Sequence, residues 1–172
     1  EMALYYLKER VENVAVVALD SLFALPDYRI NEKVFSLLIR LRALANKNFI
    51  VQTRNVKIEL FAKALKGNLL DFYRTEIAER KQYGYPPFQI FIKVVLRGKR
   101  GQVRLAMKAL ADQLVAYKPE VFPAFIPVSS MEYQMHLLLK RQILGWPDGD
   151  LLDKLKALPP QFIVDVDPDS LL

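Results

Sequence analysis

The first half of the chain alternates between short apolar runs and apolar residues at helical spacing. Val14–Leu19 is an apolar run rich in valine, which is typical of a buried strand, and Phe49–Gln52 predicts a second strand. Between them, a helix is expected after the turn at residues 25–27, with Asn31 as its N-cap. The apolar stripe of this helix consists of Val34, Leu37, Leu38, Leu41 and Leu44.

Two more helices are predicted before a strong break in the pattern. Asn55 is the expected N-cap of the first, and Gly67 ends it, because glycine tolerates the positive φ of a C′ position. Its apolar residues are Ile58, Phe61, Ala62 and Leu65. The next helix runs from Leu69 to about Gln82 and ends at Gly84, shortly before two consecutive prolines.

After residue 86 the pattern predicts four strands and two helices. The strands are Gln89–Leu96, Phe122–Val128, Tyr133–Lys140 and Phe162–Val166, with Ser129 and Ser130 between the second and the third. One helix spans Gly101–Tyr117, and Asp148 or Asp150 caps the other. The order β-α-β-β-α-β is that of a ferredoxin-like domain, in which right-handed crossovers form one antiparallel sheet with two helices on a face. The predicted fold class is therefore α+β.

The same pattern divides the chain into three parts. Residues 1–54 hold too few elements to bury a core alone, residues 55–86 form a two-helix connector, and residues 87–172 form the ferredoxin-like C-terminal domain. Because its elements are so few, we expect the first part to be a fragment of something larger, or a segment docked on the rest, and a first residue of Glu1 rather than methionine points the same way.

Composition is that of a folded protein, with 52% hydrophobic and 26% charged residues. No apolar run approaches the roughly 20 residues of a membrane span, and no signal peptide is visible. We expect no membrane partner and a cytoplasmic location, which the lack of cysteine also favours. With no cysteine and one histidine, His136, thiol catalysis is excluded and we expect no metal site.

The net charge of +6 is unevenly distributed along the chain. Residues 93–118 hold seven Lys or Arg and one acid, whereas residues 119–172 hold four basic and eight acidic groups. The candidate binding residues in the basic segment are Arg97, Lys99, Arg100, Arg104 and Lys108. The last three follow i, i+4, i+8 spacing and form one stripe on the predicted helix. Such a stripe suits the phosphates of a polyanion, and an ordinary solvated helix face is the alternative.

Four stretches carry a resemblance to a known family. Residues 18–29, ALDSLFALPDYR, are similar to a D-x-D-S-x…P-D-[FY]-R segment, and residues 50–53, IVQT, to a V-x-I-Q-T strand. Residues 72–88 match F-Y…E-x-x-x-R-x-x-x-x-Y-P-P-F, which is the most specific pattern, and residues 164–172 contain D-V-D-P. Glu1-Met2 resembles the end of a G-T-Q-M motif. In this order, they make the chain similar to the C-terminal part of the primosomal protein N′ (PriA) family of replication-restart DNA helicases.

The resemblance implies that residues 1–54 are a remnant of the second helicase lobe. Complete members of the family bind stalled replication forks, unwind DNA with ATP, and recruit other primosome proteins and the helicase loader. Their phosphate-binding loop, magnesium motif and zinc insertion lie upstream of this segment, and no G-x-x-x-x-G-K-[ST] occurs here. The resemblance also implies that the basic face binds fork or single-stranded DNA without sequence specificity. Because the nucleotide motifs lie upstream, we expect no cofactor in this chain.

The chain departs from the family where the arginine fingers lie. The family has Q-x-A-G-R-A-G-R, whereas residues 40–47 read RLRALANK. Aligned without gaps, Arg40 replaces the glutamine, and Leu44 and Lys47 replace the finger arginines, which contribute on the order of 10³-fold or more to phosphoryl transfer. Lysine lacks the planar fork of arginine, and Arg40 or Arg42 would substitute only after a register shift. We interpret the segment as a helix with a degenerate motif, and expect no ATPase activity from this chain.

Lys140 and Arg141, at the end of the third predicted strand, either extend the basic patch or bind an acidic partner. The resemblance implies that this neighbourhood receives the acidic C-terminus of single-stranded DNA-binding protein. The family often has Arg or Trp-Gln in the preceding strand, and this chain has residues 133–136, YQMH, there. The alternative to DNA binding is thus a protein-interaction scaffold that binds an acidic peptide and not DNA.

Other candidate residues favour structural roles. The aromatic residues around the Pro-Pro turn, Tyr83, Tyr85 and Phe88, either stack on bases or pack the connector against the sheet, and packing is the favoured interpretation. His136 lies among leucines, as expected of a satisfied strand histidine. Asp165 and Asp167 have no third ligand nearby in the sequence, which favours a structural or capping role. An independent small-molecule enzyme has little support.

Overall fold

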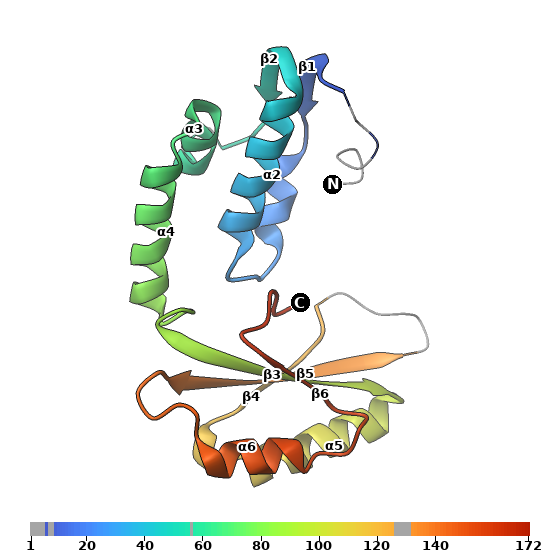
Figure 1. Cartoon of the computed structure of the whole chain (residues 1–172). Coiled ribbons are helices and arrows are strands. Elements are labelled where there is room, and N and C mark those ends of the chain that lie inside the picture. The colour runs from blue at the N-terminus through green and yellow to red at the C-terminus, as the bar shows by residue number, and fades with distance from the viewer. Residues whose placement is uncertain (1–5, 7–8, 56, 126–131) are drawn as a thin grey trace. The chain divides into compact units, whose positions relative to one another are not determined.

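The structure is a computed structural model that describes residue 6 and residues 9–55, 57–125 and 132–172. The chain divides into two compact units, Glu1–Glu79 and Arg80–Leu172 (Figure 1), each with its own hydrophobic core. The motif remnant expected at Glu1-Met2 and the turn expected at residues 129–130 lie outside the described residues.

Helices outnumber strands in the first unit. Its elements are β1 (Val11–Val16), the 3₁₀ helix η1 (Leu19–Ala24), α2 (Ile30–Leu44), β2 (Ala45–Val51), α3 (Glu59–Lys66) and α4 (Leu69–Tyr83), which continues into the second unit. β1 and β2 are parallel, with Val14 opposite Phe49. Both predicted strands are present, although β1 begins at Val11 rather than Val14. No residue separates α2 from β2.

The hydrophobic core of the first unit contains side chains of η1, α2, α3 and α4. It consists of Leu19, Val34, Phe35, Leu38, Leu60, Phe61, Ala64 and Phe72. The rings of Phe35 on α2 and Phe72 on α4 stack with centroids 3.9 Å apart and an interplanar angle of 3°. Leu19 and the buried apolar residues of α2 therefore pack in one cluster with those of α3 and α4, while the predicted three-part division of the chain stays a prediction.

Helix ends in the first unit differ in part from the prediction. Gly67 has φ +68° and ends α3, as predicted, because glycine adopts this conformation without strain. The N-cap of α2 is Arg29 and that of α3 is Ile58, and neither cap makes a side-chain hydrogen bond. The predicted caps Asn31 and Asn55 are therefore wrong. Asn31 lies inside α2, and the Asn55 side chain accepts a hydrogen bond from the Lys57 N–H before α3 begins.

The second unit contains one antiparallel sheet. Its elements are β3 (Gln89–Gly98), α5 (Arg100–Gln113), the 3₁₀ helix η2 (Val115–Tyr117), β4 (Glu120–Pro123), β5 (Tyr133–Gln142), α6 (Gly149–Lys156) and β6 (Ile163–Val166). The strand order is β4-β5-β3-β6, with every neighbouring pair antiparallel. Both α-helices lie on the same face of this sheet (Figure 1). Of the predicted caps of α6, Asp148 is confirmed, because its side chain accepts a hydrogen bond from the Leu151 N–H.

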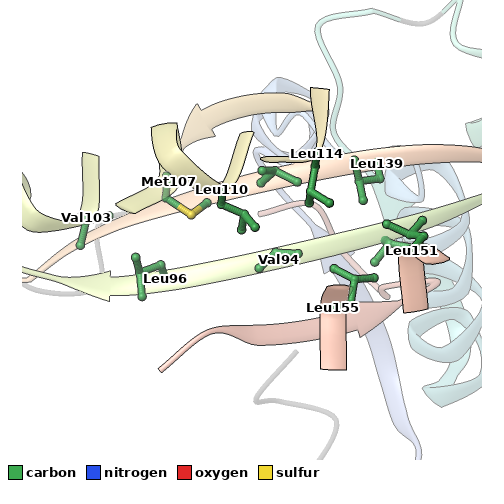
Figure 2. Packing of buried hydrophobic residues seen from close by; sticks show 11 residues of the cluster. Val94, Leu96, Val103, Met107, Leu110, Leu114, Leu139, Leu151 and Leu155 are labelled. Carbon is green, nitrogen blue, oxygen red and sulfur yellow. The ribbon is translucent and has the colours of Figure 1, made fainter. Parts of the chain in front are cut away.

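Apolar side chains of β3, β5 and both helices form the core of this unit (Figure 2). Val94 and Leu96 of β3 point toward Val103, Met107 and the other apolar residues of α5. The remaining members of the buried cluster are Ile92, Leu110, Leu114, Leu137, Leu139, Leu151 and Leu155. Because side chains alternate along a strand, the intervening residues of β3 and β5 occupy the opposite face.

The C-terminal segment packs on β3 and β5. The Asp167 N–H donates to the Phe91 carbonyl at 2.7 Å, and the Lys93 ammonium donates to the Ser170 carbonyl. Nδ1 of buried His136 lies 3.0 Å from the Leu171 carbonyl, and Pro168 is buried. The segment thereby provides hydrogen-bond acceptors for two buried basic side chains, whose burial would otherwise be unfavourable.

The mixed α+β class is confirmed. The predicted strand at residues 122–128 is shorter, since β4 ends at Pro123 and residues 126–128 lie outside the described part of the chain. Among the helices in the described part, none combines the length and the apolar character that crossing a bilayer requires.

Candidate nucleic-acid interface

The turn between β3 and α5 brings two cations, Lys99 and Arg100, to one helix end, and Arg97 precedes them in β3. β3 ends at Gly98, Lys99 is the N-cap, and α5 begins at Arg100. Lys99 makes no side-chain capping bond, and the first turn of α5 holds no acid. Gly98 has φ +150°, a conformation that side-chain-bearing residues rarely adopt.

Electrostatics at this turn favour an anion. The N-terminus of a helix carries a partial positive charge and exposes backbone N–H donors, so nearby cations are unfavourable there and anions are stabilised. Arg97 and Lys99 make no ion pair with any residue that the structure describes. The accumulation of positive charge therefore has no intramolecular compensation in the described part of the chain.

The stripe predicted on α5 is exposed as expected. Arg100, Arg104 and Lys108 face solvent, whereas Val103 and Met107 between them are buried. The Arg100 guanidinium lies 5.4 Å from the centroid of the Tyr133 ring on β5, a cation–π distance. Arg104 and Lys108 have no ion-pair partner among the residues described. The structure thus places Lys99 at the β3–α5 turn and Arg100, Arg104 and Lys108 on one side of α5, whereas Arg97 lies in β3, in register with the side chains of the sheet face opposite the helices.

A hollow of about 280 Å³ lies beside the turn. It is lined by Leu96, Arg97, Gly98, Lys99, Gln102, Val103, Ala106 and Gln161. Its charged residues are both cations, and the two glutamine amides add hydrogen-bond donors. Gln102 and Gln161 were not predicted as site residues. The position of Gln102 near the start of a basic helix could have marked it as a site residue in the sequence. Gln161 is distant in the sequence, and only the folded sheet brings it to the hollow.

Lys140 and Arg141 do not form one patch. Side chains of consecutive strand residues point to opposite faces of a sheet. Lys140 Nζ lies 2.8 Å from Glu120 Oε1, and Arg141 Nη2 lies 3.2 Å from Asp148 Oδ2. Each side chain also approaches an aromatic ring: Lys140 that of Phe91 at 5.9 Å, and Arg141 that of Tyr117 at 5.0 Å. Both cations therefore have partners within the chain.

The segment predicted to be a degenerate finger motif, residues 40–47, spans the end of α2 and the start of β2. Arg40 and Arg42 are exposed on the helix, Leu44 is its half-buried last residue, and Lys47 on β2 pairs with Glu12. Arg42 and Lys47 line an open hollow of about 530 Å³, and Arg40 and Leu44 do not. The expectation that this segment is helical is confirmed up to Leu44 and wrong for Lys47.

His136 and Asp167 have the structural roles that the sequence favoured. His136 is fully buried, and burial lowers its pKa from the ordinary value of 6.5. Since the Leu171 carbonyl only accepts, His136 Nδ1 carries the proton and Nε2 accepts from the Gln134 amide 2.6 Å away. Asp167 Oδ1 accepts from the Phe91 N–H at 3.3 Å. Within the described residues, no group of three or more His, Cys, Asp or Glu side chains is placed to hold a metal ion.

No protein-family model matches the chain. Comparison with curated proteins finds relatives in several bacteria that carry the same name. The replication restart protein PriA of Thermotoga maritima is 28% identical over 164 residues, covering 92% of this chain and 22% of that protein. PriA of Treponema pallidum is 29% identical over 175 residues, covering 92% and 27%. PriA of Borreliella burgdorferi is 31% identical over 96 residues, covering 53% and 14%. The chain thus spans about a quarter or less of the length of these curated relatives.

Proposed function

This chain is a relative of the replication restart protein PriA, and from that premise we propose that it is a DNA-binding and protein-docking module of a primosomal replication-restart helicase. The observation that carries the proposal is the group of exposed cations at the N-terminus of α5, continued along the helix by Arg104 and Lys108. The proposed ligand is fork or single-stranded DNA, bound through its phosphates without sequence specificity.

Geometry explains how the site would hold a phosphate chain. Arg97 and Lys99 line the hollow next to the first backbone N–H groups of α5, where an anion is stabilised by the helix end. Arg100, Arg104 and Lys108 follow on successive turns, about 6 Å apart along a helix that rises 1.5 Å per residue. That spacing is close to two axial steps of about 3.4 Å each along one strand of a DNA duplex.

The proposal includes no ATPase activity for this chain. Its support is the replacement of both finger arginines by Leu44 and Lys47, of which Lys47 already pairs with Glu12. The proposal likewise includes no cofactor or metal in the chain, a cytoplasmic location, and single-stranded DNA-binding protein and other primosome proteins as further partners. These parts rest on the resemblance of the sequence to the PriA family.

Charge reversal on α5 tests the DNA-binding part. The variant Arg100→Glu, Arg104→Glu, Lys108→Glu removes three proposed phosphate contacts, and a glutamate at the first position of α5 is favourable to the helix. We expect fluorescence anisotropy with a labelled forked DNA to show micromolar binding at low salt for the parent chain. The variant should bind at least about tenfold more weakly, and the slope of log affinity against log salt should fall by about 3.

A matched control separates the site from net charge. Lys57, Lys66 and Lys156 are exposed and have no ion pair among the described residues, so their reversal to Glu changes the charge of the chain equally. This control should bind close to the level of the parent chain. If both triple variants weaken binding equally, the α5 site is not the interface. No binding of the parent chain at micromolar concentration and low salt would overturn the DNA-binding proposal altogether.

The alternative function, a scaffold for an acidic peptide, has less support. Lys140 and Arg141 are each held by a carboxylate of the same unit, so an acidic partner would have to replace Glu120 and Asp148. The same charge-reversal variant distinguishes the two functions, because a scaffold that uses these two residues would keep its peptide affinity when the α5 stripe is reversed.

A ferredoxin-like arrangement of the second unit is the framework that we propose for this site. Its support is the element order β3-α5-β4-β5-α6-β6 together with the strand order β4-β5-β3-β6. In this arrangement the two crossover connections place both helices on one face, which leaves the outer side of α5 free to meet a ligand.

A further inference from the structure

Three aromatic rings form a ladder at the start of β3. The Tyr83 and Tyr85 ring centroids are 5.8 Å apart, and the Tyr85 and Phe91 centroids are 6.1 Å apart with the rings edge to face. Phe91 is fully buried, Tyr85 is half-buried, and Tyr83 is 62% exposed. The ladder therefore leads from the interior of the second unit to a ring in solvent.

Tyr83 is held in place although it is exposed. It is the last residue of α4, and the chain behind it is fixed by hydrogen bonds from the Tyr85 N–H to the Arg80 carbonyl and from the Phe88 N–H to the Tyr85 carbonyl. The neighbouring Tyr85 ring further restricts the positions open to Tyr83. A flat apolar surface held in this way binds a second flat group with little loss of side-chain entropy.

The sequence segment that contains the ladder is basic, while one carboxylate, that of Asp167, lies at its buried end beside Phe91. From residue 80 to residue 111 the sequence holds eight Lys or Arg and no Asp or Glu, and this segment contains both Tyr83 and the α5 site. Arg80 and Lys81 lie in the same last turn of α4 as Tyr83. An exposed aromatic face in a basic segment suits a ligand that combines flat rings with negative charge, such as a single-stranded nucleic acid.

We propose that Tyr83 is a stacking platform for an unpaired base of the same DNA that the α5 site binds. This inference rests on the proposed function and specifies its ligand as a strand with unpaired bases. Phe91 and Arg97 are six residues apart along β3, or about 20 Å at roughly 3.4 Å per residue. A single strand extends further per nucleotide than the roughly 3.4 Å of a duplex strand, so at most about six nucleotides span the stretch from Phe91, at the buried end of the ladder, to Arg97.

Tyr73 provides a matched control for an alanine test. It is 56% exposed on the same helix, and lies outside the basic segment of residues 80–111. The probes are a labelled oligothymidylate of about 12 nucleotides and a blunt duplex of the same length, within the range of known single-strand site sizes. We expect Tyr83→Ala to weaken binding of the single strand by roughly 5- to 100-fold in anisotropy titrations. Tyr83→Phe and Tyr73→Ala should bind the single strand as the parent does, and all variants should bind the duplex equally.

Three results would overturn the inference. These are parental affinity of Tyr83→Ala for the single strand, an equal loss for both DNAs, and a loss in Tyr83→Phe as large as in Tyr83→Ala. If Tyr83→Ala melts at a lower temperature than the parent, Tyr83→Leu supplies the same test with an apolar side chain but no flat ring. If the parent chain binds neither DNA, the proposed function is overturned as well. If the parent binds both DNAs and Tyr83→Ala keeps the parental affinity for each, only the role of Tyr83 is overturned.

Discussion

The Thr53 hydroxyl donates a hydrogen bond of 2.6 Å to Asp20 Oδ1, joining two segments that are 33 residues apart in the sequence. The other carboxylate oxygen of Asp20 accepts from the Arg54 N–H at 2.8 Å. The Thr53 hydrogen bond and then the Arg54 N–H lower the pKa of Asp20 below its ordinary value of 3.8. Asp20 therefore ties the segment after β2 to η1 through its charged form.

Asp20→Asn should lower the thermal unfolding midpoint at pH 7, because the amide accepts fewer hydrogen bonds and carries no charge. A lowered pKa in the folded state contributes stability that is present above the unfolded value and is lost as the pH falls through the folded value. The difference between the two chains should therefore close below pH 3.8. Circular dichroism melts across this range measure it, and a difference that persists undiminished at about pH 2 would contradict the assignment.

Gly98 and Gly101 should respond in opposite ways to alanine. At Gly98 a Cβ would lie 3.5 Å from Val103 Cγ2, which is an ordinary contact, but its φ of +150° is strained for alanine and costs about 1–3 kcal/mol. At Gly101, inside α5, a Cβ meets no atom within 4 Å, and alanine is a better helix former by about 0.8–1 kcal/mol. Urea unfolding should show a loss for Gly98→Ala and a gain or no change for Gly101→Ala.

His136 should titrate below its ordinary pKa of 6.5, mainly because burial penalises the charged ring and also because Lys93 and Arg97 are nearby. It is the only histidine in the sequence, so NMR titration of its ring carbon signals is unambiguous. A lowered pKa means that the unfolded chain takes up the proton first as the pH falls. Stability should therefore fall below pH 6.5 in the parent and less steeply in His136→Gln. A measured pKa at or above 6.5 would exclude this environment.

Asp148 combines two roles that substitutions can separate. Its carboxylate accepts from the Leu151 N–H at 3.2 Å as the N-cap of α6 and lies 3.2 Å from Arg141 Nη2. Asp148→Ala should lower the free energy of unfolding by about 1 kcal/mol, whereas Asp148→Asn keeps a good cap and should cost less. Equal losses in both variants, measured by urea unfolding, would show that the ion pair with Arg141 dominates.

Sequence patterns predicted the elements of this chain better than their ends. The helical spacing from Val34 to Leu44 is that of α2, and Gly67 ends α3 with the positive φ that glycine permits. The caps Asn31 and Asn55 were wrong because an asparagine ahead of an apolar run forms other local turns equally well, as Asn55 does with the Lys57 N–H. Of the two caps that the sequence left open for α6, Asp148 takes the role, and its carboxylate also pairs with Arg141.

The candidate site shows the same limit. Spacing alone placed Arg100, Arg104 and Lys108 on one exposed side of α5. No local pattern reveals that Gln161 lines the same hollow, or that Glu120 and Asp148 pair with Lys140 and Arg141, because these neighbours arise from how the sheet and α6 fold. Helical periodicity thus predicts what a segment exposes, while contacts between distant segments require the fold.

The direct passage from α2 into β2 bears on the evolutionary history of the finger segment. Leu44 ends the helix and Lys47 already lies in a strand, so both aligned arginine positions are occupied by regular backbone. Arginine substituted at these two positions would leave that backbone as it is. We expect a nucleotide-sensing loop at this place to require inserted residues as well, so that single-base substitutions alone would not produce one.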